Sequence, residues 1–256
     1  MKAPPPPDAL VSIVTPAYNA SRFVPATIAS VQAQTHGHWE MLIVDDCSKD
    51  DTVAVVEQHA ASDPRVRLIR HAKNGGPAQA RQTAIDAARG RYLAFLDSDD
   101  LWLPEKLSRQ LAFMATTGAV LSFTRFRRID ADGAVQGRLI DVPDHLSYTD
   151  LLKNTAIATS TAMVDTAATG PLRMTRTYYD DYALWLGILR AGHPARGLRE
   201  DLMRYRVLGQ SVSRNKLRSA RMVWRVYRDV ERLSLPRAVW SFGHYAANAL
   251  RKYRTF

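Results

Sequence analysis

The chain has 256 residues, of which 46% are apolar, and carries a formal net charge of +10 with a single cysteine, Cys47. This length and composition suit one large globular domain, or one domain with an appendage, and exclude an intrachain disulfide framework. No run of about 18 apolar residues occurs, and the first residues lack the apolar core of a signal peptide, so we expect neither export nor a membrane span.

The excess positive charge is confined to the end of the chain. Residues 186–256 contain 16 Lys and Arg against 4 Asp and Glu, whereas residues 1–185 contain 19 against 21. A protein that binds nucleic acid usually carries its basic surface on the main domain, so we expect no nucleic acid partner. The distribution indicates instead that the C-terminal part meets an acidic or membrane-bound partner.

Apolar runs alternate with helical patterns through the first hundred residues, after a proline-rich tail over residues 1–9. The pattern predicts strands over residues 10–16, 40–45, 65–69 and 91–96, and helices over residues 24–34, 51–60 and 76–88. Strands that alternate with helices form a doubly wound, mainly parallel α/β sheet, which binds ligands at the carboxyl ends of its strands.

Polar residues follow each of the four predicted strands, at residues 15–19, 45–48, 71–76 and 97–100. Each segment alone is compatible with an ordinary turn, but four at one edge predict a shared ligand site. The last, Asp97-Ser98-Asp99-Asp100, offers half of a ligand set for Mg²⁺ or Mn²⁺, which a substrate diphosphate would complete. The alternative is a solvated turn whose Asp100 caps a helix starting near Leu101.

The pattern of residues 210–256 predicts a basic amphipathic helical extension. Arginines recur at steps of three and four from Arg214 to a helix end at Pro236, and a second amphipathic stretch contains Trp240, Tyr245 and Leu250. Two interpretations stay open: a solvated face of a helix that packs on the catalytic domain, or a surface for anionic lipid headgroups or a lipid diphosphate. The residues assigned to that surface are Arg218, Arg221, Arg225 and Arg228.

The strand-end motifs resemble those of the family 2 glycosyltransferases of the GT-A fold, which are inverting enzymes that use nucleotide sugars. The resemblance covers about residues 9–205, in the family's order and spacing, and rests on residues 11–19, 43–48, 74–76, 80–81, 95–102 and 180–185. Three positions depart from the family pattern: Cys47 stands where Gly is common, Gln82 where Asn is common, and Asp180 where Glu is frequent.

The resemblance implies a UDP-sugar donor and a nucleotide site at the first two strand ends. In it, Tyr18 stacks on the uracil, Pro16 and Ala17 offer backbone contacts, and Asp46 accepts the imide hydrogen of the base. An acceptor at that point favours uracil over cytosine, which has no such donor. Two alternatives stay open: Asp45 holds the loop instead, and Tyr18 is only a half-buried turn aromatic.

The same resemblance assigns the diphosphate and metal positions. Arg81 reaches toward the nucleotide or diphosphate, unless it is an ordinary surface arginine. Asp97 and Ser98 belong to the nucleotide site, and Asp99 contacts Mn²⁺ or Mg²⁺, which would act on the departing UDP as a Lewis acid.

An inverting transfer needs one base for the acceptor hydroxyl, and Asp181 occupies the family's base position. The adjacent Asp180 would raise the pKa of that base by repulsion, and Asp180, Trp102 and Trp185 are expected to contact the acceptor or support the site. The alternative is that the two aspartates only cap the helix that follows them.

The sequence therefore predicts an α/β protein with a GT-A-like doubly wound, mainly parallel sheet and C-terminal amphipathic helices. We expect a catalytic domain over residues 10–209, with a nucleotide half at about 10–100 and an acceptor half at about 101–209, and the extension over 210–256. The expected activity is hexose transfer from a UDP-sugar to a saccharide acceptor linked to polyprenyl diphosphate, in the synthesis of O-antigen, capsule or exopolysaccharide. The expected location is cytoplasmic and peripheral, at the inner face of the cell membrane.

Two other classes stay open at this stage. A sugar-1-phosphate nucleotidyltransferase shares the fold and an acidic metal site, but its usual glycine-rich loop is missing because residues 15–19 contain no glycine. A non-enzymatic basic binding module would explain the charge but not the acids and aromatics at the strand ends.

Overall fold

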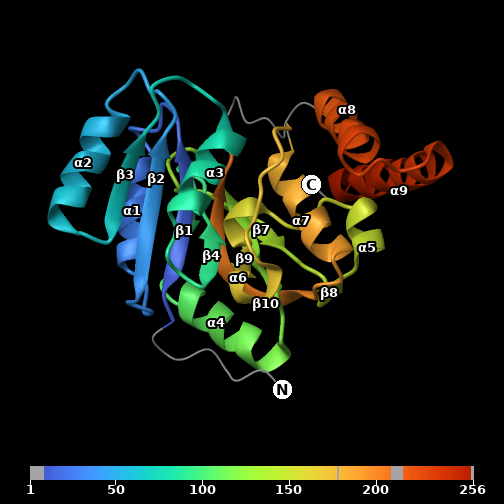
Figure 1. Cartoon of the computed structure of the whole chain (residues 1–256), viewed down its shortest axis with the longest axis horizontal. Helices are drawn as coiled ribbons and strands as arrows, with labels where there is room; N and C mark the ends of the chain where they lie inside the picture. Colours follow the sequence, from blue (N-terminus) through green and yellow to red (C-terminus); the bar gives the residue numbers. More distant parts are fainter. Residues whose placement is uncertain (1–8, 178, 209–215, 255–256) are drawn as a thin grey trace.

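A ten-stranded sheet forms the centre of the molecule (Figure 1). The computed structural model describes residues 9–177, 179–208 and 216–254, with the backbone alone at 216–217 and 249–254. The strand order is β3-β2-β1-β4-β9-β6-β10-β5, with β7 beside β6 and β8 beside β10. The strands are β1 Val11–Ala17, β2 Trp39–Asp45, β3 Val66–Arg70, β4 Tyr92–Phe95, β5 Leu101–Trp102, β6 Leu121–Ile129, β7 Gln136–Ile140, β8 His145–Leu146, β9 Met163–Asp165 and β10 Ala195–Arg206.

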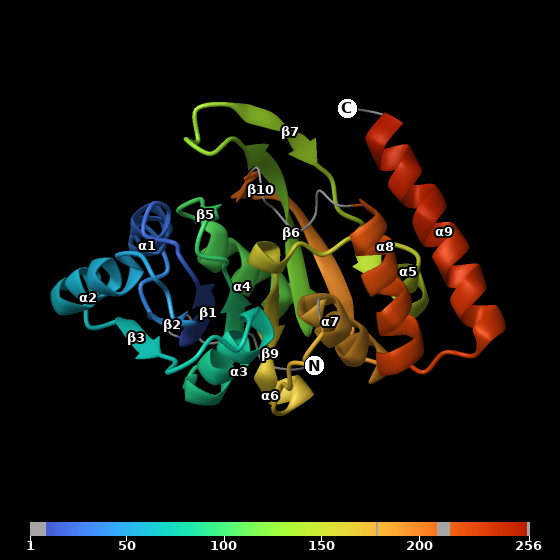
Figure 2. The same cartoon turned by 90° about the horizontal axis from the view of Figure 1, so that it is seen from above.

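The helices lie on both faces of this sheet (Figures 1 and 2). They are α1 Val24–Gln32, α2 Thr52–Ser62, α3 Pro77–Ala87, α4 Lys106–Thr117, α5 Tyr148–Leu152, α6 Thr166–Thr169, α7 Asp180–Arg190, α8 Lys216–Arg225 and α9 Leu235–Arg254, with a 3-10 turn at Thr159–Thr161 and a π-helix at Val226–Val230. No described helix combines the length and the apolar character needed to cross a bilayer.

The predicted doubly wound, mainly parallel arrangement is confirmed. Strands β1 to β4 pair in parallel in the order β3-β2-β1-β4, and β6 pairs in parallel with β10. The predicted strands and helices of the first hundred residues all occur, with ends that differ by one or two residues. The antiparallel strand β9 lies between β4 and β6 and joins the two parallel parts of the sheet.

Alternation along the buried strands creates two hydrophobic cores, one on each face of the sheet. Ile13 and Met41 face the core formed with α1, α2 and α4, whereas Val14 and Leu42 face the core formed with α3, α5 and α7. Both faces of a parallel strand are covered, so its residues are apolar at successive positions. The strands are thereby fixed in register, and their carboxyl ends meet at one edge.

The alternative in which Asp100 caps a helix that starts near Leu101 is wrong. Residues Leu101–Trp102 form β5 on the edge of β10, and α4 begins only at Lys106, with Glu105 at its N-cap. Asp100 is therefore not a capping residue, and it is buried. A two-residue edge strand carries too little periodic pattern to be separated from a helix start in the sequence.

The predicted basic helix ends earlier than expected. Helix α8 passes into the π-helix Val226–Val230, the chain turns at Arg232 with a left-handed φ of 50°, and Pro236 lies in the first turn of α9 rather than at the end of α8. Proline suits the first turn of a helix because its missing N–H would have no partner there. Arg232 lies outside the helix, so the recurring arginines end at Arg228 rather than continuing to Pro236, and Arg214 lies outside the described residues.

Candidate active site

The acidic turn Asp97–Asp100 follows β4 and is held by residues that the sequence did not single out. Ser160 accepts a hydrogen bond from the Asp97 N–H at 3.0 Å and donates its hydroxyl to Asp100 Oδ2 at 2.5 Å. The Arg206 N–H donates to Asp100 Oδ1 at 2.8 Å. Burial, reinforced by Asp99 and Asp97, raises the pKa of Asp100 well above its usual range. Asp100 is therefore an anchor of the turn.

Arg206, the last residue of β10, ties this turn to a second one. Its Nε donates to the Asp99 carbonyl at 2.8 Å, and its Nη1 donates to the carbonyls of Asp130 and Ala131 at 3.3 and 2.5 Å. The guanidinium also lies 5.2 Å from the ring centroid of Phe23. Ser160 and Arg206 lie 60 and 106 residues after Asp100 in the sequence, and no motif marks them, so only the folded chain identifies them.

Asp99 differs from its neighbours because no other described residue donates a hydrogen bond to its carboxylate. Burial, and then repulsion from Asp97, raises the pKa of Asp99 to about 6. Burial and Asp97 together outweigh the lowering effect of Arg206 and Arg81 on this pKa, so the ionised Asp99 carboxylate has negative charge in excess of what its neighbours compensate. A divalent cation would relieve that excess, so Asp99 and Asp97 fit the metal role predicted for Asp99. The described residues do not group three His, Cys, Asp or Glu side chains as a complete metal site, so further ligands would have to come from elsewhere, such as a substrate diphosphate.

Arg81 connects the acidic turn to the start of α7. Its Nη2 lies 2.6 Å from Asp97 Oδ1, and its Nη1 lies 2.7 Å from Asp180 Oδ2. The side chain is 8% exposed, so the reading as an ordinary surface arginine is wrong. Burial alone would lower its pKa, but Asp97, Asp180 and Asp181 outweigh burial and raise it. Arg81 thus carries a permanent charge between the two acidic segments.

Asp181 lies at this junction, in the first turn of α7. Thr159 Oγ1 donates to its Oδ2 at 2.5 Å, and the Tyr182 N–H donates to its Oδ1 at 2.7 Å. Burial and then Asp180 raise the pKa of Asp181, against the lowering effect of Arg81. Neither aspartate is the N-cap residue, which is Tyr179, and the Asp180 carboxylate faces Arg81. Asp181 Oδ1 thus accepts one N–H of the first turn of α7, as the capping alternative expects, whereas Asp180 pairs with Arg81; Asp181 stays the predicted base.

The turn after β2 uses its carboxylates to hold the chain. Asp46 Oδ1 accepts from the Gly75 N–H and contacts His71 Nδ1, each at 2.8 Å, and its Oδ2 accepts from the Gly76 N–H at 2.7 Å. Asp45 Oδ2 accepts from the Ser48 N–H at 3.2 Å, while its buried Oδ1 has no hydrogen-bond partner among the described residues. In this structure Asp46 holds the loop at 71–76, the role that was considered for Asp45. Its binding to the uracil imide stays a prediction.

The remaining predicted nucleotide residues lie at the same edge of the sheet. Pro16 and Ala17 end β1, and the Ala17 carbonyl accepts from the Asp46 N–H at 2.8 Å. Tyr18 is 51% exposed, which leaves its ring available for stacking. The Ser98 carbonyl accepts from Thr27 Oγ1 at 3.0 Å, which fixes the backbone of the acidic turn.

The two predicted tryptophans lie beneath the site. Trp102 is 3% exposed and donates its Nε1–H to the Ser160 carbonyl at 2.7 Å. Trp185 is 1% exposed, and its ring meets Phe95 edge-on with centroids 5.1 Å apart. Buried side chains cannot contact an acceptor directly, so a supporting role fits both.

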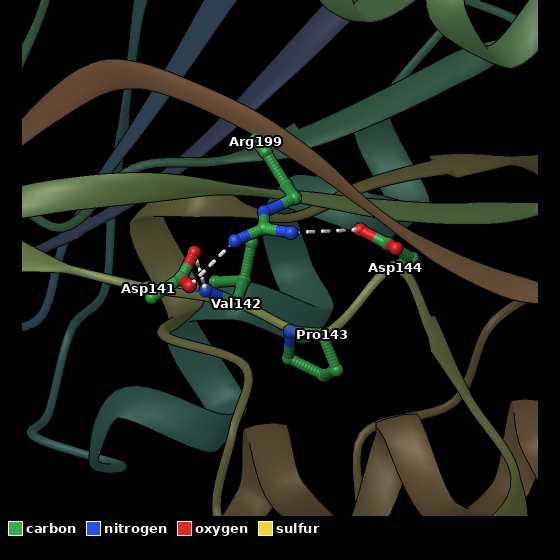
Figure 3. Close-up of a pocket in the computed structure, with 5 residues that line it drawn as sticks. All are labelled: Asp141, Val142, Pro143, Asp144 and Arg199. Carbon is green, nitrogen blue, oxygen red and sulfur yellow. Dashed lines mark hydrogen bonds and ion pairs between the residues drawn. The ribbon is translucent and has the colours of Figure 1, made fainter.

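An open hollow of about 350 Å³ lies away from these residues, between the chain after β7 and Arg199 of β10 (Figure 3). Arg199 points between Asp141 and Asp144, with its Nη2 2.9 Å from Asp141 Oδ2 and its Nη1 3.8 Å from Asp144 Oδ1. None of the predicted site residues lines it. Its charged groups already neutralise one another, so we place the active site at the sheet edge.

The arginines assigned to a lipid surface lie on α8 and the π-helix. Arg218, Arg221, Arg225 and Arg228 are all exposed. Arg228 Nη1 also donates to the Leu233 carbonyl, which closes the turn between the helices. The opposite face of this segment is buried in the core with α5 and α7, through Val223, Val226 and Tyr227.

Comparison with known proteins agrees with this geometry. Residues 12–181 match the family described as Glycosyl transferase family 2. A Bacillus subtilis (strain 168) protein named putative teichuronic acid biosynthesis glycosyltransferase TuaG is 44% identical over 245 residues, which cover 95% of this chain and 97% of that protein. The Escherichia coli protein WfgD, named UDP-Glc:alpha-D-GlcNAc-diphosphoundecaprenol beta-1,3-glucosyltransferase, is 33% identical over 247 residues, which cover 96% of each chain.

Solved structures show the same fold. The mannosyltransferase PcManGT from Pyrobaculum calidifontis, solved with GDP-Man and Mn²⁺, superposes with a TM-score of 0.70 at 17% identity, over 96% of this chain and 75% of that one. At this identity the likeness establishes the architecture, while the donor has to be argued from the residues.

Proposed function

The chain belongs to glycosyl transferase family 2 and has the GT-A fold, and on this premise we propose that it transfers a hexose, with inversion, from a UDP-sugar to a saccharide linked to polyprenyl diphosphate. One observation carries the proposal: Arg81 joins the acidic turn to Asp180, beside Asp181. The ion pairs hold the acidic turn next to Asp181, whose pKa is raised, and this supports assigning the turn to the metal and diphosphate and Asp181 to the base. An inverting transfer needs both groups.

The chemistry is a single displacement at the anomeric carbon. The acceptor oxygen forms the new bond to this carbon as the bond to the UDP oxygen breaks, and the hydroxyl proton passes to Asp181. Thr159 and the Tyr182 N–H hold the Asp181 carboxylate in one orientation. When bound, a divalent cation at Asp99 and Asp97 supplies positive charge to the departing diphosphate. On the donor side, Tyr18 stacks on the uracil, Pro16, Ala17 and Ser98 line the nucleotide, and Asp46 or the free Oδ1 of Asp45 faces its imide.

The acceptor class and the location rest on the relatives and on the basic surface. The name of WfgD specifies a diphosphoundecaprenol-linked acceptor, and TuaG is named for teichuronic acid biosynthesis. Such an acceptor is held in a membrane, and exposed arginines near anionic lipid contribute about 1 kcal/mol each. We therefore place the protein at the inner face of the cell membrane, with Arg218, Arg221, Arg225 and Arg228 toward the headgroups.

A donor panel tests the activity. Release of the nucleoside diphosphate is measured with UDP-glucose, UDP-galactose and UDP-N-acetylhexosamines, and with GDP-mannose as the comparison, in Mn²⁺, in Mg²⁺ and in excess EDTA. We expect one UDP-sugar to be used with metal and none without it. Full turnover in EDTA contradicts the metal role, release of pyrophosphate from a nucleoside triphosphate and a sugar phosphate reveals a nucleotidyltransferase, and no binding of UDP favours a binding module.

The base is tested by Asp181→Asn. We expect transfer to fall roughly 10²–10⁴-fold while UDP affinity, measured by calorimetry, stays close to that of the parent. Asp86→Asn is the matched control, because Asp86 pairs with Arg173 at the surface of α3. Transfer within a few-fold of the parent in Asp181→Asn would remove Asp181 from the mechanism and make Asp180 the next candidate.

A further inference from the structure

Exposed apolar side chains concentrate at one place on the molecule. Five large apolar side chains are strongly exposed among the described residues, and three of them lie within the first six residues of α9: Leu235 at 57%, Val239 at 55% and Trp240 at 51%. We call these three residues the α9 ridge. The other two, Tyr18 and Val135, lie apart from it and from each other in sequence. Isolated exposed apolar residues need no explanation, but a cluster marks an interaction surface.

The ridge is the outer face of a helix whose inner face is already packed. Ala238 and Ser241 are buried, and Phe242 and Tyr245 pack against the core shared with α5 and α7. The Phe242 ring meets Trp224 of α8 edge-on, with centroids 5.5 Å apart. Helix α9 lies at the outside of the molecule along α8 (Figure 2). Trp240 meets the His244 ring edge-on, with centroids 4.5 Å apart, and all three ridge side chains still expose more than half of their surface.

The surroundings of the ridge are cationic. Lys153 Nζ lies 4.7 Å from the centroid of the Trp240 ring, and Arg237 is exposed between Leu235 and Val239. Over residues 218–248, whose side chains the structure describes, the sequence holds six arginines against two acids, and one of these acids, Glu231, is buried and bonded to Arg190 and Tyr148. An apolar strip with an indole, edged by cations, has the composition of a helix that lies in the interface of an anionic membrane.

From this arrangement we propose that the α9 ridge enters the headgroup region of an anionic lipid bilayer and adds an apolar component to membrane binding by the α8 arginines. This inference rests on the proposed function in one respect: a lipid-linked acceptor is the reason for the protein to bind a membrane. A second protein is the less suitable occupant, since a stable interface takes about 20–30 residues a side, and the ridge has three large side chains beside the cations Lys153 and Arg237. The two contributions are separable, because salt screens the arginines and leaves the apolar part.

Trp240 itself reports on the proposal. Of the five tryptophans, Trp39, Trp102 and Trp185 are buried, Trp224 is partly buried, and Trp240 alone is half exposed. If the ridge enters the bilayer, anionic vesicles shift the emission of the full-length protein to shorter wavelength, and phospholipids brominated on their acyl chains quench it. Trp240→Phe should lose both signals and still bind, because Phe keeps an apolar ring at that position. Unchanged emission of the parent protein on bound vesicles would overturn the proposal.

Co-sedimentation with phosphatidylcholine vesicles containing phosphatidylglycerol, at low and at high salt, measures the two components. We expect the triple variant Leu235→Ser, Val239→Ser, Trp240→Ser to lose at least about tenfold in partition coefficient and to lose the salt-resistant part of binding. Val135→Ser is the matched control: Val135 is 64% exposed and distant from α9 in sequence, so this variant should sediment as the parent does. Arg218, Arg221 and Arg225 changed to Gln should remove the salt-sensitive part, with Arg228 kept because it closes the turn at Leu233.

Three results would overturn the proposal: parent-like sedimentation of the triple variant, an equal loss in Val135→Ser, or a parent dimer in solution that the triple variant converts to a monomer. Circular dichroism and melting temperature establish that each variant is folded. The proposed function is tested separately by transfer from the UDP-sugar to a short-chain, water-soluble diphosphate acceptor by the parent protein. Sugar transfer without vesicle binding would refute only the membrane role of the α9 ridge. Vesicle binding without sugar transfer would refute only the proposed function.

Discussion

Two acidic strand ends lie at the same edge of the sheet and use their carboxylates in opposite ways. At the turn after β2, Asp46 accepts from two backbone N–H groups and contacts His71. At the turn after β4, Asp100 anchors the chain, whereas Asp99 accepts no hydrogen bond from another described residue and has a pKa raised to about 6. A carboxylate that accepts hydrogen bonds from the chain stabilises the fold, whereas one whose negative charge is not compensated is available to a ligand.

The largest effect that this difference predicts is on catalysis. Asp99→Asn should lower transfer by roughly 10²–10⁴-fold, since the cation loses its proposed ligand at the departing diphosphate. Mn²⁺ should raise the melting temperature of the parent and leave that of the variant unchanged. If the Asp99→Asn variant keeps most of its metal-dependent activity, the assignment of Asp99 to a ligand rather than to the fold is contradicted.

The opposite result is expected at the other turn. Asp46→Asn removes one acceptor oxygen and the negative charge that faces two N–H groups, so it should lower the free energy of unfolding by about 1–3 kcal/mol. Denaturant titration measures this loss, and calorimetry with UDP decides the second role. If Asp46 only holds the loop, UDP affinity falls little at temperatures where the variant is folded, whereas a large loss of affinity in a stable variant would assign Asp46 to the uracil.

A pH series on the metal-free protein sharpens the comparison further. The pKa of Asp99 in the folded protein lies above its usual value of 3.8, so the native state binds this proton more tightly than the unfolded chain does. The free energy of unfolding that this proton contributes is fully present below about pH 4 and is lost as the pH rises through about 6. Asp99→Asn does not titrate. The free energy of unfolding of the variant should therefore rise by about 1–2 kcal/mol relative to that of the parent between pH 4 and 7. A difference in unfolding free energy that stays constant across that range would contradict the raised pKa.

The smallest effect concerns the backbone next to Asp46. Cys47 has a left-handed φ of 66°, a region that glycine enters without the steric cost of a side chain. Cys47→Gly should raise the free energy of unfolding by up to about 1 kcal/mol and leave transfer unchanged. Cys47→Ala is the control for loss of the thiol, and equal stability of the two variants would show that the left-handed turn is not the cause.

The early elements and the motif positions were predictable from the sequence because they depend on local pattern. Buried parallel strands require continuous apolar runs such as residues 41–44, and their connecting helices require a period near 3.6, so the order of strands and helices to residue 100 follows from patterning. The order in turn brings the ends of β1, β2 and β4 together, which is why residues 15–19, 45–48 and 97–100 were expected at one edge. The predictions at β5 and at the end of α8 were wrong because too few residues there carry a periodic apolar pattern.

Only the tertiary structure shows which carboxylates are supplied with hydrogen-bond donors and which are not. The aspartates of one turn are the same residue type in the sequence, and what separates Asp46 and Asp100 from the others is the donors that reach them from residues 75–76, 160 and 206. The same holds for Arg81, which is a buried link between two acidic segments because β4 and α7 meet beside α3. Hydrogen bonds and burial are set by distance in space, and a pattern that is local in sequence contains no information about contacts across a hundred residues.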